Sequence, residues 1–217
     1  IKAGKAADIS GQSNACMKGL KQETVEKIAT LLRSKDDTPP EDWKKSQGLF
    51  LHKKGDKEVL SNYRLLSISP TMSRFMGAIA GQQLRGILEH HYGPEQHGFR
   101  KGHSTVSLLH ILEIIIDEAK AGNTEVVIVQ IDVAKAFDKV DRKAVESFAK
   151  IIVARSAPEA AKFISEMYKG DKVEINYGKA KRTVTMKSGI RQGDPISSPI
   201  SSALLGHILK PLIKKWK

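Results

Sequence analysis

The stretch VVIVQIDVAKAFDKVD, residues 126–141, poses the main structural question in this chain. Its apolar, β-branched beginning predicts a buried strand over residues 126–131. Asp132 stands at the end of that strand, and Asp138 follows six residues later. Two interpretations of Asp132 are open: a turn residue that ends the strand, or a carboxylate that holds a cation within reach of a substrate. Asp138 is also suited to cap the helix that we expect over residues 141–154.

The pattern outside this stretch predicts both helices and strands. Apolar spacing and capping residues predict further helices over residues 21–34, 71–91, 106–122 and 197–213. Strands are expected within residues 47–56 and 62–69, and a hairpin is expected within residues 172–194, around Gly178. Because helices and strands interleave without a regular βαβ rhythm, we predict an α+β fold.

Composition narrows the class of protein. The 217 residues suit one large domain or two closely packed subdomains, and 40% hydrophobic content suffices for a core. The formal charge of +12 favours a polyanionic partner, nucleic acid first, over a merely well-solvated surface.

Cys16 is the only cysteine, so no internal disulfide forms and a reducing compartment is expected. No apolar run approaches the ~20 residues of a membrane span. Because the sequence starts at Ile1, we expect a segment of a longer product.

The stretch GIRQGDPISSP, residues 189–199, is a second candidate site. Gly189 and Gly193 bracket Arg191 and Gln192, and glycine lets a ligand approach the backbone closely. The alternative is an ordinary exit from a hairpin.

Two basic stretches are also candidates. Lys53, Lys54 and Arg64 lie on neighbouring predicted strands, where they either clamp a triphosphate or form a solvated basic hairpin. The stretch GPEQHGFRKGHST, residues 93–105, has the glycine spacing of a phosphate loop but lacks its Lys and Ser or Thr, so we reject a P-loop. The seven histidines show no zinc-ligand spacing.

Four stretches together resemble a known family. KKGD…NYR, EQHGFRKGHST, VQIDVAKAFDKV and GIRQGDP are similar, in sequence and in order, to the reverse transcriptases of non-LTR (LINE-type) retrotransposons. The resemblance runs from about Pro40 to Leu209 and implies a right-hand polymerase of which this chain holds the fingers and part of the palm, without a thumb. It implies fingers over residues 1–105, the first catalytic palm strand within 106–140, connecting helices and a hairpin of fingers and palm over 141–190, and the start of a palm helix over 191–217.

The resemblance also implies roles for individual residues. Asp132 corresponds to the first catalytic aspartate, and the backbone carbonyl of Val133 would be a further metal ligand. Phe137 corresponds to the residue that excludes a ribose 2′-hydroxyl. The residues expected to contact the incoming dNTP are Lys53, Lys54, Arg64, Phe137, Gln192 and Gly193. Those expected to contact the template are Arg100 and Lys101.

The implied reaction is RNA-directed DNA synthesis, in which a primer 3′-hydroxyl attacks a dNTP with the help of two Mg²⁺ ions. The expected partners are an RNA template, a DNA primer and the rest of a parent polyprotein, with the remaining palm, a thumb and an endonuclease. The expected location is intracellular, in the nucleus or the cytoplasm, with no membrane contact.

The chain departs from the family in one important way. The family's second aspartate pair, in Tyr-x-Asp-Asp, is missing, and the only adjacent pair, Asp36-Asp37, lies far upstream. We therefore expect the chain alone to be inactive and to expose an apolar patch or a strand edge where the palm is incomplete. The alternatives are a non-catalytic RNA- or DNA-binding remnant of such an element, and another Mg²⁺ nucleotidyltransferase or nuclease that shares only the strand-end aspartate.

Overall fold

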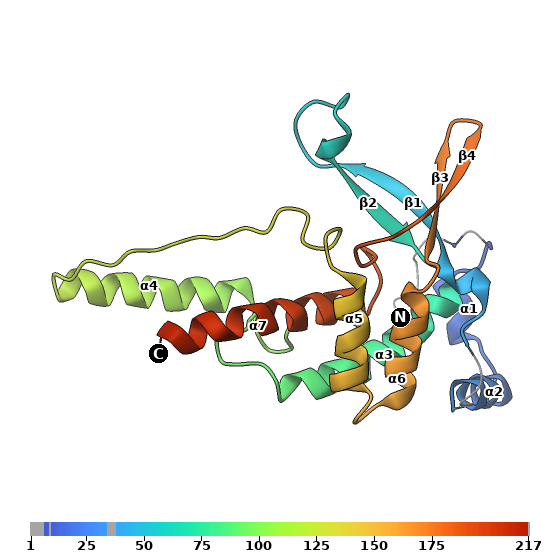
Figure 1. Ribbon diagram of the computed structural model, residues 1–217, viewed down its shortest axis with the longest axis horizontal. Helices are drawn as coiled ribbons and strands as arrows, with labels where there is room; N and C mark the ends of the chain where they lie inside the picture. Colours follow the sequence, from blue (N-terminus) through green and yellow to red (C-terminus); the bar gives the residue numbers. More distant parts are fainter. Residues whose placement is uncertain (1–6, 9, 34–37, 217) are drawn as a thin grey trace.

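The computed structural model describes residues 7–8, 10–33 and 38–216, and two β-hairpins in it form one sheet (Figure 1). The strand order is β2-β1-β3-β4. Strands β1 (Lys45–His52) and β2 (Tyr63–Ile68) are antiparallel, as are β3 (Lys172–Tyr177) and β4 (Ala180–Thr185). A parallel pairing of β1 with β3 joins the two hairpins. Both hairpins project from one end of the helical body, so only the strand ends nearest that body are buried.

The hairpin predicted around Gly178 is confirmed. Tyr177 pairs with Ala180, so the connection has two residues, and Gly178 has φ +56°. Two-residue hairpin connections favour turns with positive φ, which glycine adopts without steric cost.

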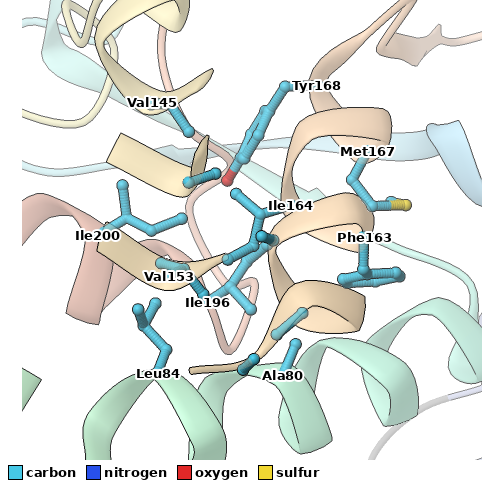
Figure 2. Packing of buried hydrophobic residues seen from close by; sticks show 14 of the residues in the cluster. Ala80, Leu84, Val145, Val153, Phe163, Ile164, Met167, Tyr168, Ile196 and Ile200 are labelled. Carbon is cyan, nitrogen blue, oxygen red and sulfur yellow. The ribbon is translucent and has the colours of Figure 1, made fainter. Parts of the chain in front are cut away.

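The hydrophobic core lies among helices rather than on the sheet (Figure 2). Four helices build most of it: α3 (Thr71–Glu89), α5 (Arg142–Phe148), α6 (Pro158–Tyr168) and α7 (Ser197–Trp216). A π-helical turn, η3 (Ala149–Val153), continues α5. The side chains that are fully buried at its centre include Leu84, Ile164, Ile196 and Ile200. Short 3₁₀ turns precede the first two strands, η1 (Glu41–Lys44) and η2 (Leu60–Asn62).

Three helices contribute no fully buried hydrophobic residue to this core, although Ile28 of one of them packs against it. Helices α1 (Asn14–Lys18) and α2 (Gln22–Arg33) lie at the N-terminal side of α3. Helix α4 (Thr105–Ala121) begins at Ser104, whose side chain accepts from the Ser107 amide, and ends at Gly122, as expected. No helix in the described part of the chain is long and apolar enough to cross a membrane.

The strand predicted over residues 126–131 is absent, and that prediction was wrong. The segment is extended and runs from the end of α4 back toward α5 (Figure 1). Val127, Val129 and Ile131 are 87%, 76% and 78% exposed. A strand needs a neighbour to satisfy its backbone N–H and C=O groups, and within residues 7–8, 10–33 and 38–216 no strand pairs with this segment.

The apolar patch expected beside an incomplete palm is present. It comprises the exposed apolar residues of α4 and of the following segment: Val106, Leu108, Leu109, Ile111, Ile114, Ile115, Val126, Val127, Ile128, Val129 and Ile131. A concentration of exposed apolar residues is typical of a face that another segment or protein covers.

The predicted cap of the following helix was also wrong. Asp141, not Asp138, is the N-cap residue of α5, because its side chain accepts the Lys143 amide hydrogen over 2.9 Å. Regular α-helix ends at Phe148 and gives way to η3, which ends one residue before the expected boundary. The mixed α+β class is confirmed. Asp36 and Asp37 lie outside the described residues.

Candidate functional site

Two of the motif stretches contact each other through their backbones. The Ile190 amide donates to the Phe137 carbonyl over 2.9 Å, and the Gly189 amide donates to the Val140 carbonyl over 2.8 Å. Gly189 has φ +82°, and a Cβ there would lie 2.8 Å from the Asp138 carbonyl oxygen. Glycine is therefore required at residue 189 for both its conformation and its close approach to Asp138.

Gln192 connects these stretches with the end of β2. Its side-chain Nε2 donates to Asp138 Oδ1 over 3.0 Å, and its carbonyl accepts the Ser67 amide hydrogen over 2.9 Å. Gly193 has φ +105°, and a Cβ at this residue would lie 3.4 Å from the Ser67 carbonyl oxygen. The stretches AFDKV, GIRQGDP and LLSIS thus meet at one place, which we call the Gln192 junction.

A group of charged side chains with little exposure adjoins the Gln192 junction through Arg191, the residue before Gln192. Asp171, in the turn between α6 and β3, is fully buried and binds two arginines. Its Oδ1 accepts from Arg191 Nε over 2.9 Å and from Arg191 Nη2 over 2.7 Å, while its Oδ2 accepts from Arg142 Nη2 over 2.5 Å. We call these three residues the Asp171 triad.

Asp194 links the Gln192 junction to α7 and α3. Its Oδ1 accepts the Ile196 amide hydrogen over 3.3 Å just before α7 begins, and a Cβ at Gly77 would lie 3.0 Å from the same oxygen. Burial raises the pKa of the Asp194 carboxyl, and the nearby positive charge of Arg191 counteracts only part of this rise. The carboxyl therefore pays a desolvation penalty whenever it ionises.

Asp132 and Val133 are exposed on the extended segment before α5. Within residues 7–8, 10–33 and 38–216, no group of three or more His, Cys, Asp or Glu side chains is placed to hold a metal ion. Among the described residues, the Asp132 carboxylate is thus presented to solvent outside any such ligand group.

Phe137 connects the extended segment to the core. It is partly buried against the hydrophobic cluster, and its ring meets that of Phe99 edge-on, with centroids 6.4 Å apart. Phe99 is 58% exposed, so the QHGFRKG stretch and the AFDKV stretch present an aromatic pair at the surface.

Lys53, Lys54 and Arg64 lie on the β1–β2 hairpin, and all three are exposed. Arg64 stands opposite Leu51 in the antiparallel pairing, and the Lys53 amide donates to the Asn62 carbonyl over 2.9 Å. Arg64 precedes Ser67 by three residues on the same strand, which corresponds to about 10 Å along β2. The hairpin therefore carries these cations, and its second strand is hydrogen-bonded to the Gln192 junction.

Arg100 and Lys101 differ in their surroundings. Arg100 donates to Glu89 Oε1 over 2.9 and 2.7 Å and to the Gly93 carbonyl over 2.9 Å, and it lies over the Tyr92 ring. The hydrogen bond from Arg100 lowers the pKa of Glu89. Arg100 thus fixes the loop after α3, whereas Lys101 is exposed.

Sequence reasoning missed two members of the Asp171 triad. Arg142 follows the helix cap in VDRKAV, and Asp171 stands in KGDK. Both stretches resemble the solvated charges that surround most helix ends, so no local pattern distinguishes them.

Comparisons with known proteins identify the family of this chain. The family model for reverse transcriptase (RNA-dependent DNA polymerase) matches residues 51–217. The chain belongs to the reverse transcriptase family. It is 26% identical over 182 residues to the retrovirus-related Pol polyprotein from type-1 retrotransposable element R2 of Popillia japonica, covering 82% of this chain and 24% of that protein. It is 30% identical over 141 residues to the probable RNA-directed DNA polymerase from transposon BS of Drosophila melanogaster, covering 63% of this chain and 16% of that protein.

These relatives confirm the resemblance to non-LTR retrotransposon reverse transcriptases. A third, the transposon TX1 uncharacterized 149 kDa protein of Xenopus laevis, is 23% identical over 168 residues, which is 76% of this chain and 13% of that protein. The chain spans about a quarter or less of the length of these curated relatives. The family is one of RNA-directed DNA polymerases, which are nucleotidyltransferases.

Proposed function

We propose that this chain is the fingers and part of the palm of an RNA-directed DNA polymerase that extends a primer 3′-hydroxyl with dNTPs on an RNA template. The observation that carries the proposal is the Gln192 junction, where two of the motif stretches meet each other and the end of β2 although they lie far apart in sequence. Their convergence supports a shared site rather than separate, unrelated turns.

The nucleotide side of the site consists of the β1–β2 hairpin and the Gln192 junction. Lys53, Lys54 and Arg64 bind the triphosphate, because exposed cations gathered on one hairpin suit phosphate oxygens. Gln192 and Gly193 lie against the nucleotide, where the glycine permits close approach of the backbone. Phe137 restricts the space at the sugar, since its ring is held by the core and by Phe99.

The Asp132 carboxylate and the Val133 carbonyl are the candidate metal ligands. Both offer the oxygen ligands that Mg²⁺ prefers, and both residues are exposed. They fit only part of a two-metal site, because such a site needs further carboxylates that the described residues do not group with Asp132. When bound, two Mg²⁺ ions would stabilise charge on the attacking and leaving oxygens.

The proposed domain plan follows the sequence prediction. Fingers extend over residues 1–105, the first palm segment over 106–140, connecting helices and hairpin over 141–190, and the start of the palm helix over 191–217. The apolar patch on α4 and the extended segment supports an incomplete palm, because residues 126–131 have the composition of a buried strand and no partner in the described chain. The absence of a thumb from this segment is part of the same proposal.

The proposed partners are an RNA template, a DNA primer and the rest of a polyprotein, in the nucleus or the cytoplasm. Lys101 contacts the template phosphates, while Arg100 holds the loop that presents it. Binding of this kind is mainly electrostatic and weakens as salt concentration rises.

Primer extension on an RNA template, with Mg²⁺ and dNTPs, tests the proposal. The comparison is between these 217 residues and a polypeptide in which the same chain continues through the next palm segment of its parent reading frame. Extension only by the longer polypeptide supports the proposal. Failure of both, with RNA binding that weakens steeply with salt, supports instead a non-catalytic RNA- or DNA-binding remnant. The lack of a metal-ligand group among the described residues and the +12 charge favour this as the second candidate.

A further inference from the structure

The Asp171 triad connects parts of the chain that together hold the Gln192 junction. Besides Asp171, Arg191 donates to the Lys44 carbonyl over 2.6 Å and to Ser69 Oγ over 3.1 Å. Lys44 immediately precedes β1, and Ser69 immediately follows β2. Arg191 is only 4% exposed and directly precedes Gln192. Its hydrogen bonds therefore attach the base of the β1–β2 hairpin to the loop that carries Gln192.

Arg142 connects the same carboxylate to the helical body. It donates to the Gly189 carbonyl over 3.0 Å and to the Tyr168 carbonyl over 2.9 Å, and its guanidinium lies 5.3 Å from the Tyr168 ring centroid. Arg142 thus binds the first residue of the loop 189–191, and Arg191 is its last residue. Both arginines have Asp171 as their acidic partner.

The charges of the Asp171 triad make its structure sensitive to the removal of any one member. Two buried or half-buried cations share one carboxylate, so removal of that carboxylate would leave both in a poorly solvated place. Well-packed apolar side chains could replace such a triad if it served stability alone. They could not make the directed hydrogen bonds by which the two guanidinium groups hold defined backbone carbonyls. The bond directions therefore point to a positioning role.

We propose that Asp171 is a positioning residue for the nucleotide side of the site, holding Gln192 on Asp138 and the β1–β2 hairpin in one fixed unit through Arg142 and Arg191. This inference rests on the proposed polymerase function. Asp171 touches no reacting atom. It sets the distance between the hairpin cations and the Gln192 junction, so its loss weakens dNTP binding more than template binding.

Hydrogen exchange on the 217-residue chain tests the positioning step without any need for activity. Arg142→Lys keeps the charge but loses the fork that serves Asp171, Gly189 and Tyr168 together. The amides of Ser67, Gly189 and Ile190 should exchange about tenfold faster or more, while those of Ile164 and Met167 in α6 keep their rates. Lys143→Gln, at an exposed neighbour on α5, should change none of them. Uniform acceleration, or no acceleration, in Arg142→Lys would overturn the positioning role.

Steady-state kinetics of the longer polypeptide tests the link to dNTP binding. Arg142→Lys, and Asp171→Asn where it folds, should raise the KM for dNTP about tenfold and leave the RNA dissociation constant unchanged. A merely structural role would lower kcat and RNA binding together and leave the KM for dNTP unchanged, which would overturn the inference. If the unmodified polypeptide makes no DNA, the proposed function and the nucleotide role both fail, and the exchange experiment still decides whether the triad holds the junction.

Discussion

Gln192 Nε2 donates a hydrogen bond to Asp138 Oδ1 over 3.0 Å, across a separation of 54 residues. The Gln192 carbonyl meanwhile accepts from the Ser67 amide, so this one residue touches the segment after Asp132 on one side and the end of β2 on the other. Gln192 therefore connects the segment that carries the candidate metal ligand with the hairpin that carries the candidate nucleotide-binding cations, through its side chain on one side and its backbone on the other.

Replacement of Asp138 tests this contact. Asp138→Ala removes the acceptor, and because the bond is exposed we expect the free energy of unfolding to fall by only about 1 kcal/mol. Asp138→Asn keeps an acceptor oxygen and should cost less. Denaturant unfolding of both variants, alone and combined with Gln192→Ala, measures the coupling between the two side chains. Fully additive effects of Asp138→Ala and Gln192→Ala would show that the bond contributes nothing.

Gly189 should tolerate no side chain. In Gly189→Ala the new Cβ meets the Asp138 and Phe137 backbone at 2.8–3.0 Å in addition to the strain of φ +82°. Gly178→Ala is a matched control, because Gly178 has φ +56° and open space around it. We expect Gly189→Ala to lower the free energy of unfolding by about 2 kcal/mol more than the control does. Equal losses would mean that the loop can move away from Asp138.

Asp8 should stabilise the start of α3. Burial favours a higher pKa for Asp8, but hydrogen bonds from Ser10, Thr71 and Gln12 outweigh it and lower the pKa to about 2. Because the folded pKa lies below the unfolded value, the stabilisation is complete above about pH 5 and is lost as pH falls toward about 2. Asp8→Asn loses part of these bonds and should cost about 1–2 kcal/mol at pH 7.

The difference in unfolding free energy between the parent chain and Asp8→Asn should therefore shrink as the pH is lowered below about 4. Asp56→Asn is the control, because Asp56 lies in the exposed loop of the β1–β2 hairpin and its replacement should cost less than about 0.5 kcal/mol. A difference for Asp8→Asn that stays constant down to acid pH would contradict the account of the Asp8 contacts.

Asp194 should behave in the opposite way. Burial raises its pKa, so its ionisation costs stability as pH rises from the unfolded value through the folded one. Asp194→Asn keeps an acceptor for the Ile196 amide and removes the charge. We expect the variant to gain stability relative to the parent chain as pH rises from about 4, until the gain levels off above the raised pKa. A variant that is less stable at pH 8 than at pH 4, relative to the parent, would show that Arg191 compensates the charge fully.

The sequence predicted elements whose stabilising contacts are local. The hairpin at Gly178 and the end of α4 at Gly122 depend on turn and capping chemistry within a few residues, and both are confirmed. The strand at 126–131 depends instead on a partner, which composition cannot supply. Its residues have the right β propensity and still remain extended and exposed.

The candidate site likewise contains residues that local sequence predicted and residues that it did not. Gln192 and Gly193 were singled out because glycine and proline mark their loop, and the structure brings them to Asp138 and Ser67. Asp171 was not predicted, because its importance comes from two arginines that lie 20 and 29 residues away along the chain. Long-range ion groups of this kind leave no periodic or local pattern.

The most direct test of the central claim is primer extension by the longer polypeptide with Asp132→Asn, alongside RNA binding at several salt concentrations. Asparagine keeps the size of the side chain and removes the charge that a Mg²⁺ ligand needs. The account predicts that synthesis falls by about a thousandfold or more while RNA affinity and its salt dependence stay the same. Synthesis at the unmodified rate in Asp132→Asn would contradict the assignment of Asp132 to the reaction.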